Sequence, residues 1–210
     1  MLSLDVSNPK SYPGSGTTWY DLSGNNYRHT LSGNLLTTAG GVQCFDVSTS
    51  GWIDRTSTSY TFGTSYTMMS WARPLADSAV ATWRTLFRTQ PDDHPLLIQD
   101  ATNLIGYYDN NAGGFISYGI NAGTIGIENV WTLFTIVGTN NSITLHINDS
   151  RYSGTIYGYT ASGNTHYTIG STSGSGQPFG YVATTQLYNR ALSVAEIKQA
   201  FNASRSKYGV

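Results

Sequence analysis

The chain has 210 residues, of which only 11% are charged, and its formal net charge is −1. An average domain has about 25% charged residues, so this composition indicates a polar but largely uncharged surface. The absence of any run of Lys or Arg excludes the basic patch of a nucleic-acid-binding protein, and no apolar run is long enough to span a membrane. The single cysteine, Cys44, excludes an intrachain disulfide.

The N-terminal quarter has the composition of turns and short strands. Its start, MLSLDVSNPK, lacks a basic segment followed by an apolar stretch, so we expect no signal peptide. Asp21 lies in DLSGNN, where an Asp forms a turn by hydrogen bonding to the nearby backbone. Cys44 lies in VQCFDV, which predicts a buried strand in which the thiol packs as a small hydrophobic group.

Two central segments, 66–74 and 130–138, are apolar on both faces. Such strands lie in the middle of a sandwich or carry another element over their outer face. The segment 141–149 instead alternates, with Ile143, Leu145 and Ile147 on one face. The runs LIGYYD, GFISYGI, THYTIGS and FGYVATTQLY are further strand patterns, separated by turns and not by helices. We therefore predict an all-β fold of two antiparallel sheets in a single domain, 1–210.

The C-terminal segment has the only strong helix pattern, which we place at about 193–207. Ser193 and Glu196 form a capping box, and Leu192 and Ile197 form a hydrophobic staple. At helical spacing Val194, Ile197, Phe201 and Tyr208 follow one face, so we expect the helix to pack as a lid on the sandwich edge.

Several motifs occur in the order found in laminin-G-like, concanavalin A-like jelly-roll domains, and the chain resembles that family over its whole length. The matching residues are Trp19, Asp21, Asn25, Trp71, Trp131, Tyr188, Asn189, Arg190, Ser193 and Glu196. The resemblance implies a two-sheet jelly-roll sandwich that ends in a short helix.

The two terminal motifs look most like those of structural proteins of tailed bacteriophages. That resemblance implies a non-catalytic virion protein, assembled in the host cytoplasm, which decorates a capsid or belongs to a tail appendage such as a fibre. Its partners would be other virion proteins, in many copies, and host surface polysaccharide. The alternative is a carbohydrate-binding, lectin-like module of a larger secreted or surface protein.

Catalysis is not expected, because glycosidases of this fold class need paired carboxylates on one strand. The chain has only two glutamates, Glu128 in a turn and Glu196 in the capping box. The acidic segment 90–95, with His94, reads as a solvated loop. No cofactor is expected either; calcium is the alternative, with Asp21 and Asp46 as carboxylate ligands, although the segment after 178 lacks the Asp that many family members carry there.

A glycan site would need an aromatic platform beside planar hydrogen-bonding groups. On strand parity, four residues are predicted to share one polar sheet face with Ser117 and Thr144: Arg84, Arg88, Tyr107 and His146. That prediction requires Trp83 and Phe87 to point inward. The competing interpretation is an ordinary solvated face.

Overall fold

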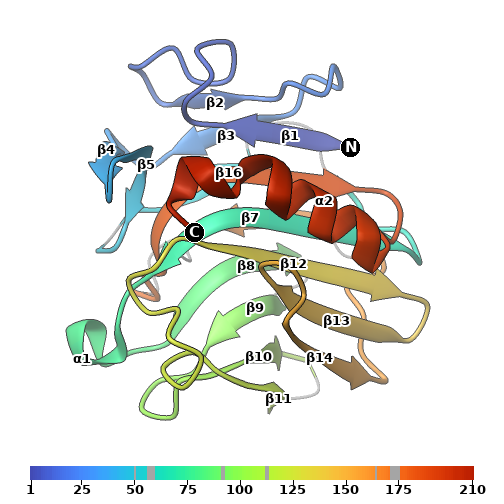
Figure 1. Ribbon diagram of the computed structural model, residues 1–210. Coiled ribbons are helices and arrows are strands. Elements are labelled where there is room, and N and C mark those ends of the chain that lie inside the picture. Colours follow the sequence, from blue (N-terminus) through green and yellow to red (C-terminus); the bar gives the residue numbers. More distant parts are fainter. Residues whose placement is uncertain (50, 56–59, 91–92, 112–113, 164, 171–175) are drawn as a thin grey trace.

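The computed structural model describes residues 1–210 except 50, 56–59, 91–92, 112–113, 164 and 171–175. Two antiparallel sheets pack face to face (Figure 1), which confirms the predicted all-β sandwich. Sheet A has the order β14-β13-β12-β7-β16-β5-β4, and β1 also pairs with β16. Its strands are β1 Leu2–Asp5, β4 Leu36–Ala39, β5 Val42–Val47, β7 Tyr66–Pro74, β12 Thr132–Thr139, β13 Ser142–Ile147, β14 Tyr152–Tyr157 and β16 Gly180–Tyr188.

Sheet B has the order β11-β10-β9-β8-β15-β6-β3-β2. Its strands are β2 Thr18–Tyr20, β3 Arg28–Leu31, β6 Ile53–Arg55, β8 Arg84–Gln90, β9 His94–Ile98, β10 Leu104–Asp109, β11 Gly114–Asn121 and β15 Thr165–Ile169. Three short helical elements complete the described chain: α1 Asp77–Val80, α2 Val194–Ser204 and the 3₁₀ helix η1 Arg205–Tyr208.

The main core lies between the two sheets. Ile143, Leu145 and Ile147 all belong to it and are fully buried, as their alternation on β13 predicts. Strands β7 and β12 are central in sheet A. Each contributes one face to this core, for example Met68 and Phe134. Their opposite faces are also buried, because a second apolar cluster covers sheet A from outside.

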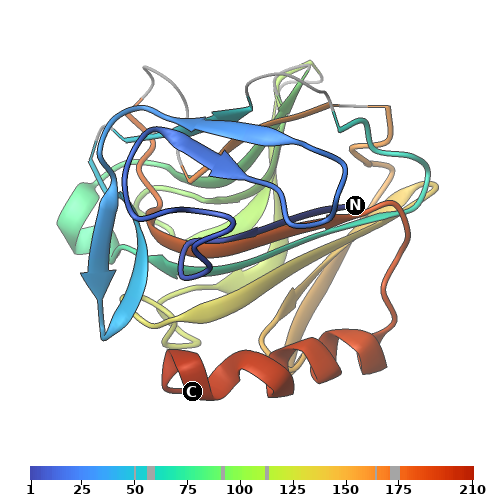
Figure 2. The ribbon, with the colours of Figure 1, turned by 90° about the horizontal axis from the view of Figure 1, so that it is seen from above.

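Helix α2 provides that cover. The capping box of Ser193 and Glu196 is present, which confirms the predicted helix start. Ile197 and Phe201 are buried against sheet A, but Val194 is 55% exposed and does not belong to the apolar face. The expected position was also wrong: α2 lies along the outer face of sheet A and not on the sandwich edge (Figures 1 and 2), because Met69, Trp71 and neighbouring side chains leave that face apolar.

We call the second apolar cluster the covered face, and Trp71 lies at its centre. Its ring stacks on Tyr208, with centroids 4.0 Å apart, and its indole N–H donates to Ser204 Oγ at 2.9 Å. Trp131 packs against the same Tyr208 ring and donates to the carbonyl oxygen of Ala39. Cys44 is buried in this cluster, and burial raises the pKa of its thiol to about 11, so it is an inert apolar group.

The remaining motif residues fix the two ends of the chain. Trp19 is fully buried, edge-on to Phe45. Asp21 Oδ1 accepts hydrogen bonds from the backbone N–H groups of Ser3 and Ser23, and Asn25 Nδ2 donates to the Met1 carbonyl oxygen. These contacts tie β1 to the turn after β2.

The segment between β16 and α2 is fixed in the same way. The Thr67 hydroxyl on β7 donates to the Arg190 carbonyl oxygen and accepts from the Leu192 N–H. Arg190 also forms an ion pair with Glu196 at 2.7 Å. Tyr188 and Asn189 therefore belong to a connection that sets where the helix begins.

Candidate functional site

The predicted common polar face is not formed. Arg84, Arg88 and Tyr107 lie on sheet B, whereas His146 lies on β13 of sheet A. Parity fails on β8 because the β8–β9 pairing shifts register between Thr85 and Phe87.

Arg84 is an internal cation and not a ligand-binding group. Its side chain is fully buried and forms ion pairs with Asp77 at 3.1 Å and Glu128 at 3.5 Å. It also donates to the Leu75 carbonyl oxygen at 2.6 Å and to the Asn103 side chain. Arg84 therefore holds α1 and the turn before β12 together. Its ion pair with Glu128 gives that carboxylate a structural role.

Tyr107 and His146 are also largely buried. The Tyr107 hydroxyl donates to Asp93 Oδ2 at 3.0 Å, and burial together with the adjacent carboxylate raises the pKa of Tyr107. Burial lowers the pKa of His146, whose side chain is 8% exposed. Of the four predicted residues only Arg88 is half-buried, so they do not form one sugar platform.

A different set of aromatic residues lines a pocket at β8, β9 and β10. This aromatic pocket has a volume of about 230 Å³ and is lined by Trp83, His94, Leu97, Tyr108, Asn110 and Gln177. Trp83 and Tyr108 are half-buried, so part of each ring is accessible. Their rings meet edge to face, with centroids 5.6 Å apart and an interplanar angle of 88°.

Strand register builds the aromatic wall. Tyr108 is paired with His94 on one side and with Phe115 on the other, so neighbouring strands place the three rings in one row. Trp83, from the loop before β8, then packs edge-on against Phe115 at 5.5 Å. Gly106 makes room for the Phe115 ring, because a Cβ at position 106 would lie 2.2 Å from an atom of that ring.

Polar groups complete the pocket rim. The Thr85 hydroxyl donates to Gln177 Oε1 at 2.6 Å and lies 3.0 Å from His94 Nδ1. Because Oε1 is occupied, Gln177 presents its amide N–H groups as donors. Trp83 and Tyr108, whose side chains carry an indole N–H and a hydroxyl, line the same pocket, so its lining combines aromatic rings with hydrogen-bonding side chains.

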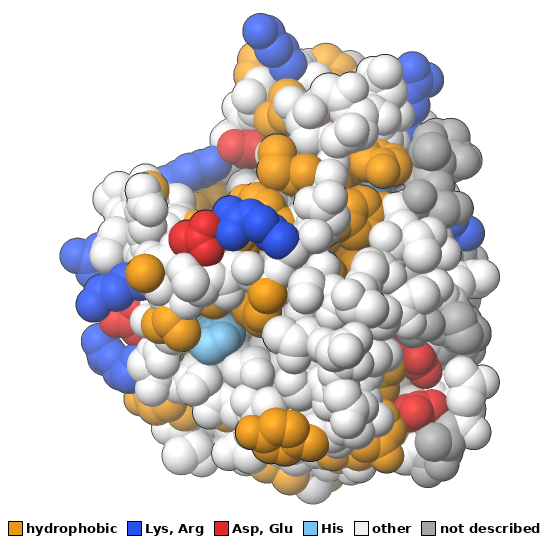
Figure 3. Space-filling view, turned by 90° about the vertical axis from the view of Figure 1, so that its right-hand side faces the viewer, with side chains coloured by type: hydrophobic (Ala, Val, Ile, Leu, Met, Phe, Trp, Pro, Cys, Tyr) orange, Lys and Arg blue, Asp and Glu red, His pale blue; other side chains and the backbone are white. Residues whose placement is uncertain are grey.

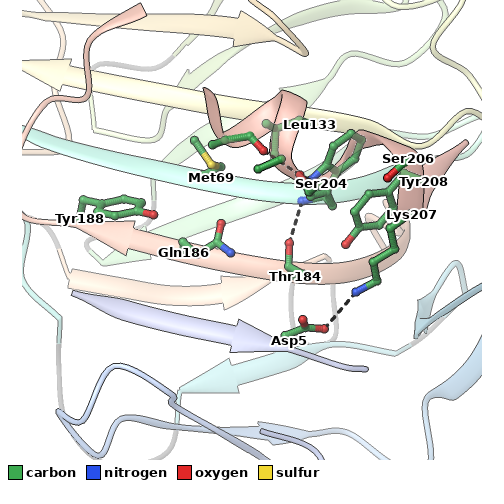
Figure 4. Close-up of a pocket in the computed structure, with 13 residues that line it drawn as sticks. Asp5, Met69, Leu133, Thr184, Gln186, Tyr188, Ser204, Ser206, Lys207 and Tyr208 are labelled. Carbon is green, nitrogen blue, oxygen red and sulfur yellow. Dashed lines mark hydrogen bonds and ion pairs between the residues drawn. The ribbon is translucent and has the colours of Figure 1, made fainter. Parts of the chain in front are cut away.

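A second cavity, the helix–sheet cleft, lies between α2, η1 and the outer face of sheet A (Figure 4). Its volume is about 330 Å³. Lys207 bridges its mouth by pairing with Asp5 at 3.4 Å. Trp71 and Tyr208 line it, but both are at most 5% exposed. The cleft therefore presents edges of the covered face, and Tyr188 is its one half-buried aromatic lining residue.

The sequence contained one signal for the aromatic pocket. Tyr108 follows Tyr107 directly, so one of the two rings had to face away from the core. Parity did not show which of them pairs with other aromatic side chains, because the β9–β10 pairing shifts register between Gly106 and Tyr108. His94, expected in a solvated loop, begins β9 and is 7% exposed. Pro91 and Asp92 of that expected loop lie outside the described residues.

The calcium alternative finds little geometric support. Within the described ranges no group of three or more His, Cys, Asp or Glu side chains is placed to hold a metal ion. Asp21 uses its carboxylate for the turn that contains Ser23, and Asp46 Oδ1 accepts from the Ser48 N–H. No helix in the described part of the chain is long and apolar enough to cross a membrane.

The architecture is a two-sheet jelly roll with an aromatic pocket on one sheet and a C-terminal helix over the other. Residues 47–198 match the family described as the concanavalin A-like lectin/glucanases superfamily, and the chain belongs to it. No curated protein sequence matches the chain.

Solved structures show the same fold at low sequence identity. The binding domain of botulinum neurotoxin DC in complex with SialylT superposes with a TM-score of 0.67 at 16% identity, over 97% of this chain and 50% of that one. A botulinum neurotoxin serotype D ligand binding domain in complex with N-acetylneuraminic acid gives 0.64 at 15% identity, again over 97% and 50%. Trypanosoma rangeli sialidase gives 0.65 at 13% identity, over 98% and 33%. The chain thus spans half or less of these structures, and the likeness shows the fold alone.

Proposed function

We propose that this protein is a non-catalytic carbohydrate-binding domain and that the aromatic pocket holds the sugar. The observation that carries this proposal is the half-buried Trp83–Tyr108 pair beside the Gln177 amide. Sugar rings have apolar C–H faces that pack on aromatic rings, and their hydroxyls pair with amide and indole donors. An open aromatic pair with adjacent donors meets both requirements.

The state of the two glutamates supports binding over hydrolysis. Glu128 is held by Arg84 and accepts from the Asp77 N–H, and Glu196 caps α2 and pairs with Arg190. Neither lines the aromatic pocket. A glycosidase needs two carboxyl groups that flank one bond, and these two are engaged in separate structural roles.

Weak single-site binding is expected from so small a pocket, and several copies held together would raise the effective affinity through avidity. The surface suits such use: on the face shown in Figure 3, charged side chains occur only in small groups among uncharged ones. Contacts made by such a surface depend little on salt.

A glycan array followed by titration of the best ligand tests the proposal. We expect binding by the unmodified chain and a loss of at least about tenfold in affinity for Trp83→Ala and Tyr108→Ala. Tyr157→Ala is the matched control, because Tyr157 is 78% exposed on β14 of the other sheet. Absence of binding to every glycan, or equal loss in the control, would reject the proposal.

Attachment to a virus particle is the second candidate, and the bacteriophage-like terminal motifs favour it. In that role the chain would be a capsid decoration or tail-appendage component, present in many copies, and the aromatic pocket would contact host polysaccharide. Mass spectrometry of purified phage particles tests this candidate directly. Detection at a fixed copy number supports it, and absence from the particles rejects it.

A further inference from the structure

The charges around the aromatic pocket indicate which class of sugar it takes. Building on the proposed function, we infer that the pocket selects uncharged saccharides and disfavours acidic ones such as sialic acid. The inference concerns this chain alone: the match to sialic-acid-bound neurotoxin domains covers only half of those structures.

No permanently charged cation lines the pocket; His94 is the one titratable base among the lining residues. Its six lining residues include neither Lys nor Arg. The 15 residues outside the described part of the chain contain none either, so every Lys and Arg has a described position. Arg84 is adjacent to Trp83 in sequence, but it is buried and paired with Asp77 and Glu128. A sugar carboxylate in the pocket would therefore lack the Arg or Lys partner that such groups normally find.

Arg88 is the other arginine of β8, and it has an acidic neighbour on the same sheet. Arg88 and Asp54 are both paired with Thr168 on β15, so that strand alone separates them. The Arg88 charge also lowers the pKa of Asp54, against the dominant effect of burial, which raises it. Arg88 does not line the aromatic pocket.

Acidic residues instead neighbour the pocket residues. Asp93 is 6% exposed, accepts from Tyr107 and also accepts from the Asn110 N–H at 3.3 Å. It precedes His94, and Asp109 follows Tyr108, so two pocket residues are adjacent to acidic ones. Like charges in a partly desolvated site repel. A bound carboxylate would face this repulsion, whereas a neutral sugar would not.

The polar rim matches hydroxyl groups. The Trp83 indole N–H and the Gln177 amide N–H groups donate to oxygen, while the Tyr108 hydroxyl both donates and accepts. The volume of about 230 Å³ is below the roughly 300 Å³ at which pockets for drug-sized ligands begin. We therefore expect one neutral ring to be enclosed and the rest of a glycan to lie outside.

Matched glycans give the test. The full chain is titrated by NMR with the best neutral oligosaccharide from the array and with the same oligosaccharide ending in sialic acid. We expect affinity for the sialylated form to be lower by at least about tenfold. Equal or tighter sialylated binding that is lost in Trp83→Ala overturns this inference and leaves carbohydrate binding intact. If neither form binds, and no other glycan does, the proposed function itself fails.

Salt provides a second readout that does not depend on a variant folding. Raising NaCl from about 0.05 M to about 0.5 M screens the repulsion. Sialylated binding should strengthen, while neutral binding should change less than about twofold. Sialylated binding that weakens with salt would show an attractive cation at the site and overturn the inference.

A charge variant checks the same argument from the protein side. Asp93→Asn removes the negative charge and keeps an oxygen that accepts from Tyr107. The ratio of sialylated to neutral affinity should rise by at least about threefold. An unchanged ratio in a folded variant would contradict the role given to Asp93.

Discussion

The two sheets carry similar aromatic side chains in opposite surroundings. On sheet A, Trp71 stacks between Tyr208 and Phe201 under the C-terminal helix and is 3% exposed. Beside sheet B, Trp83 meets Tyr108 and Phe115 edge-on, no helix of the described residues covers them, and the three residues are half-buried. Residue type alone therefore does not separate a covered aromatic cluster from an open one; the presence of a covering element does.

Removal of residues 191–210, which takes the cover off sheet A, is expected to lower the stability of the domain more than any other change considered. The truncated chain loses Ile197, Phe201 and Tyr208 and exposes Trp71 and its neighbours. Several buried side chains are each worth about 1.5–3 kcal/mol, which exceeds much of a typical domain stability. We expect no cooperative thermal transition by circular dichroism. A truncated chain that unfolds cooperatively near the full-length melting temperature would show that the covered face does not need its helix.

The two tryptophans give the most direct comparison. Trp71→Ala should lower the free energy of unfolding by about 3–5 kcal/mol, because it leaves a cavity under the helix. Trp83→Ala should cost about 1 kcal/mol, since it removes only edge-to-face contacts. Urea denaturation measures both values. Similar losses in the two variants would remove the distinction between a covered and an open face.

Ser193→Ala tests the start of the covering helix alone. Its side chain accepts from the Glu196 N–H. Loss of this cap should cost about 1 kcal/mol, or a melting temperature lower by about 2–4 °C at this chain length. Glycan affinity should stay unchanged, because the cap belongs to the helix over sheet A, whereas the aromatic pocket lies on sheet B. A change in affinity would reveal coupling between the two faces.

Acid should weaken the same cap by a smaller amount. Hydrogen bonds from Arg190 and then from Ser193 lower the pKa of Glu196 to about 2. The carboxylate therefore contributes stability above its ordinary pKa of 4.5, and that contribution is lost as pH falls from there toward about 2. Melting temperatures of the unmodified chain and Glu196→Gln should differ at pH 7 and converge in acid. A constant difference would contradict this linkage.

The covered face could be predicted from sequence far better than the open one. Periodicity marked 66–74 and 130–138 as apolar on both sides, and the Ser193–Glu196 pair marked the helix start, because each of these patterns is local. The aromatic pocket depends on which strands pair and where they shift register. His94 and Tyr108 are 14 positions apart and meet across a bulge, so no local spacing relates them.

The same limit explains the wrong assignment of Arg84. Alternation placed it on an outer face with Arg88, yet one register shift after Thr85 brings Leu86 and Phe87 both into the core. Burial of an arginine is rare unless carboxylates pair with it. Asp77 and Glu128 are 51 residues apart in sequence, so their convergence on one guanidinium follows only from the fold.

Because Asp77 and Glu128 converge on Arg84, the cation that neutralises these two carboxylates is part of the chain itself. Two carboxylates, an amide oxygen and a backbone carbonyl surround the Arg84 guanidinium, and such oxygens are also the groups that a bound calcium ion would attract. A bound ion leaves when it is diluted or chelated, whereas a guanidinium is covalently part of the chain and keeps its charge at all ordinary pH values. The junction of α1 with the turn before β12 is therefore held by a charge that dilution or chelation cannot remove.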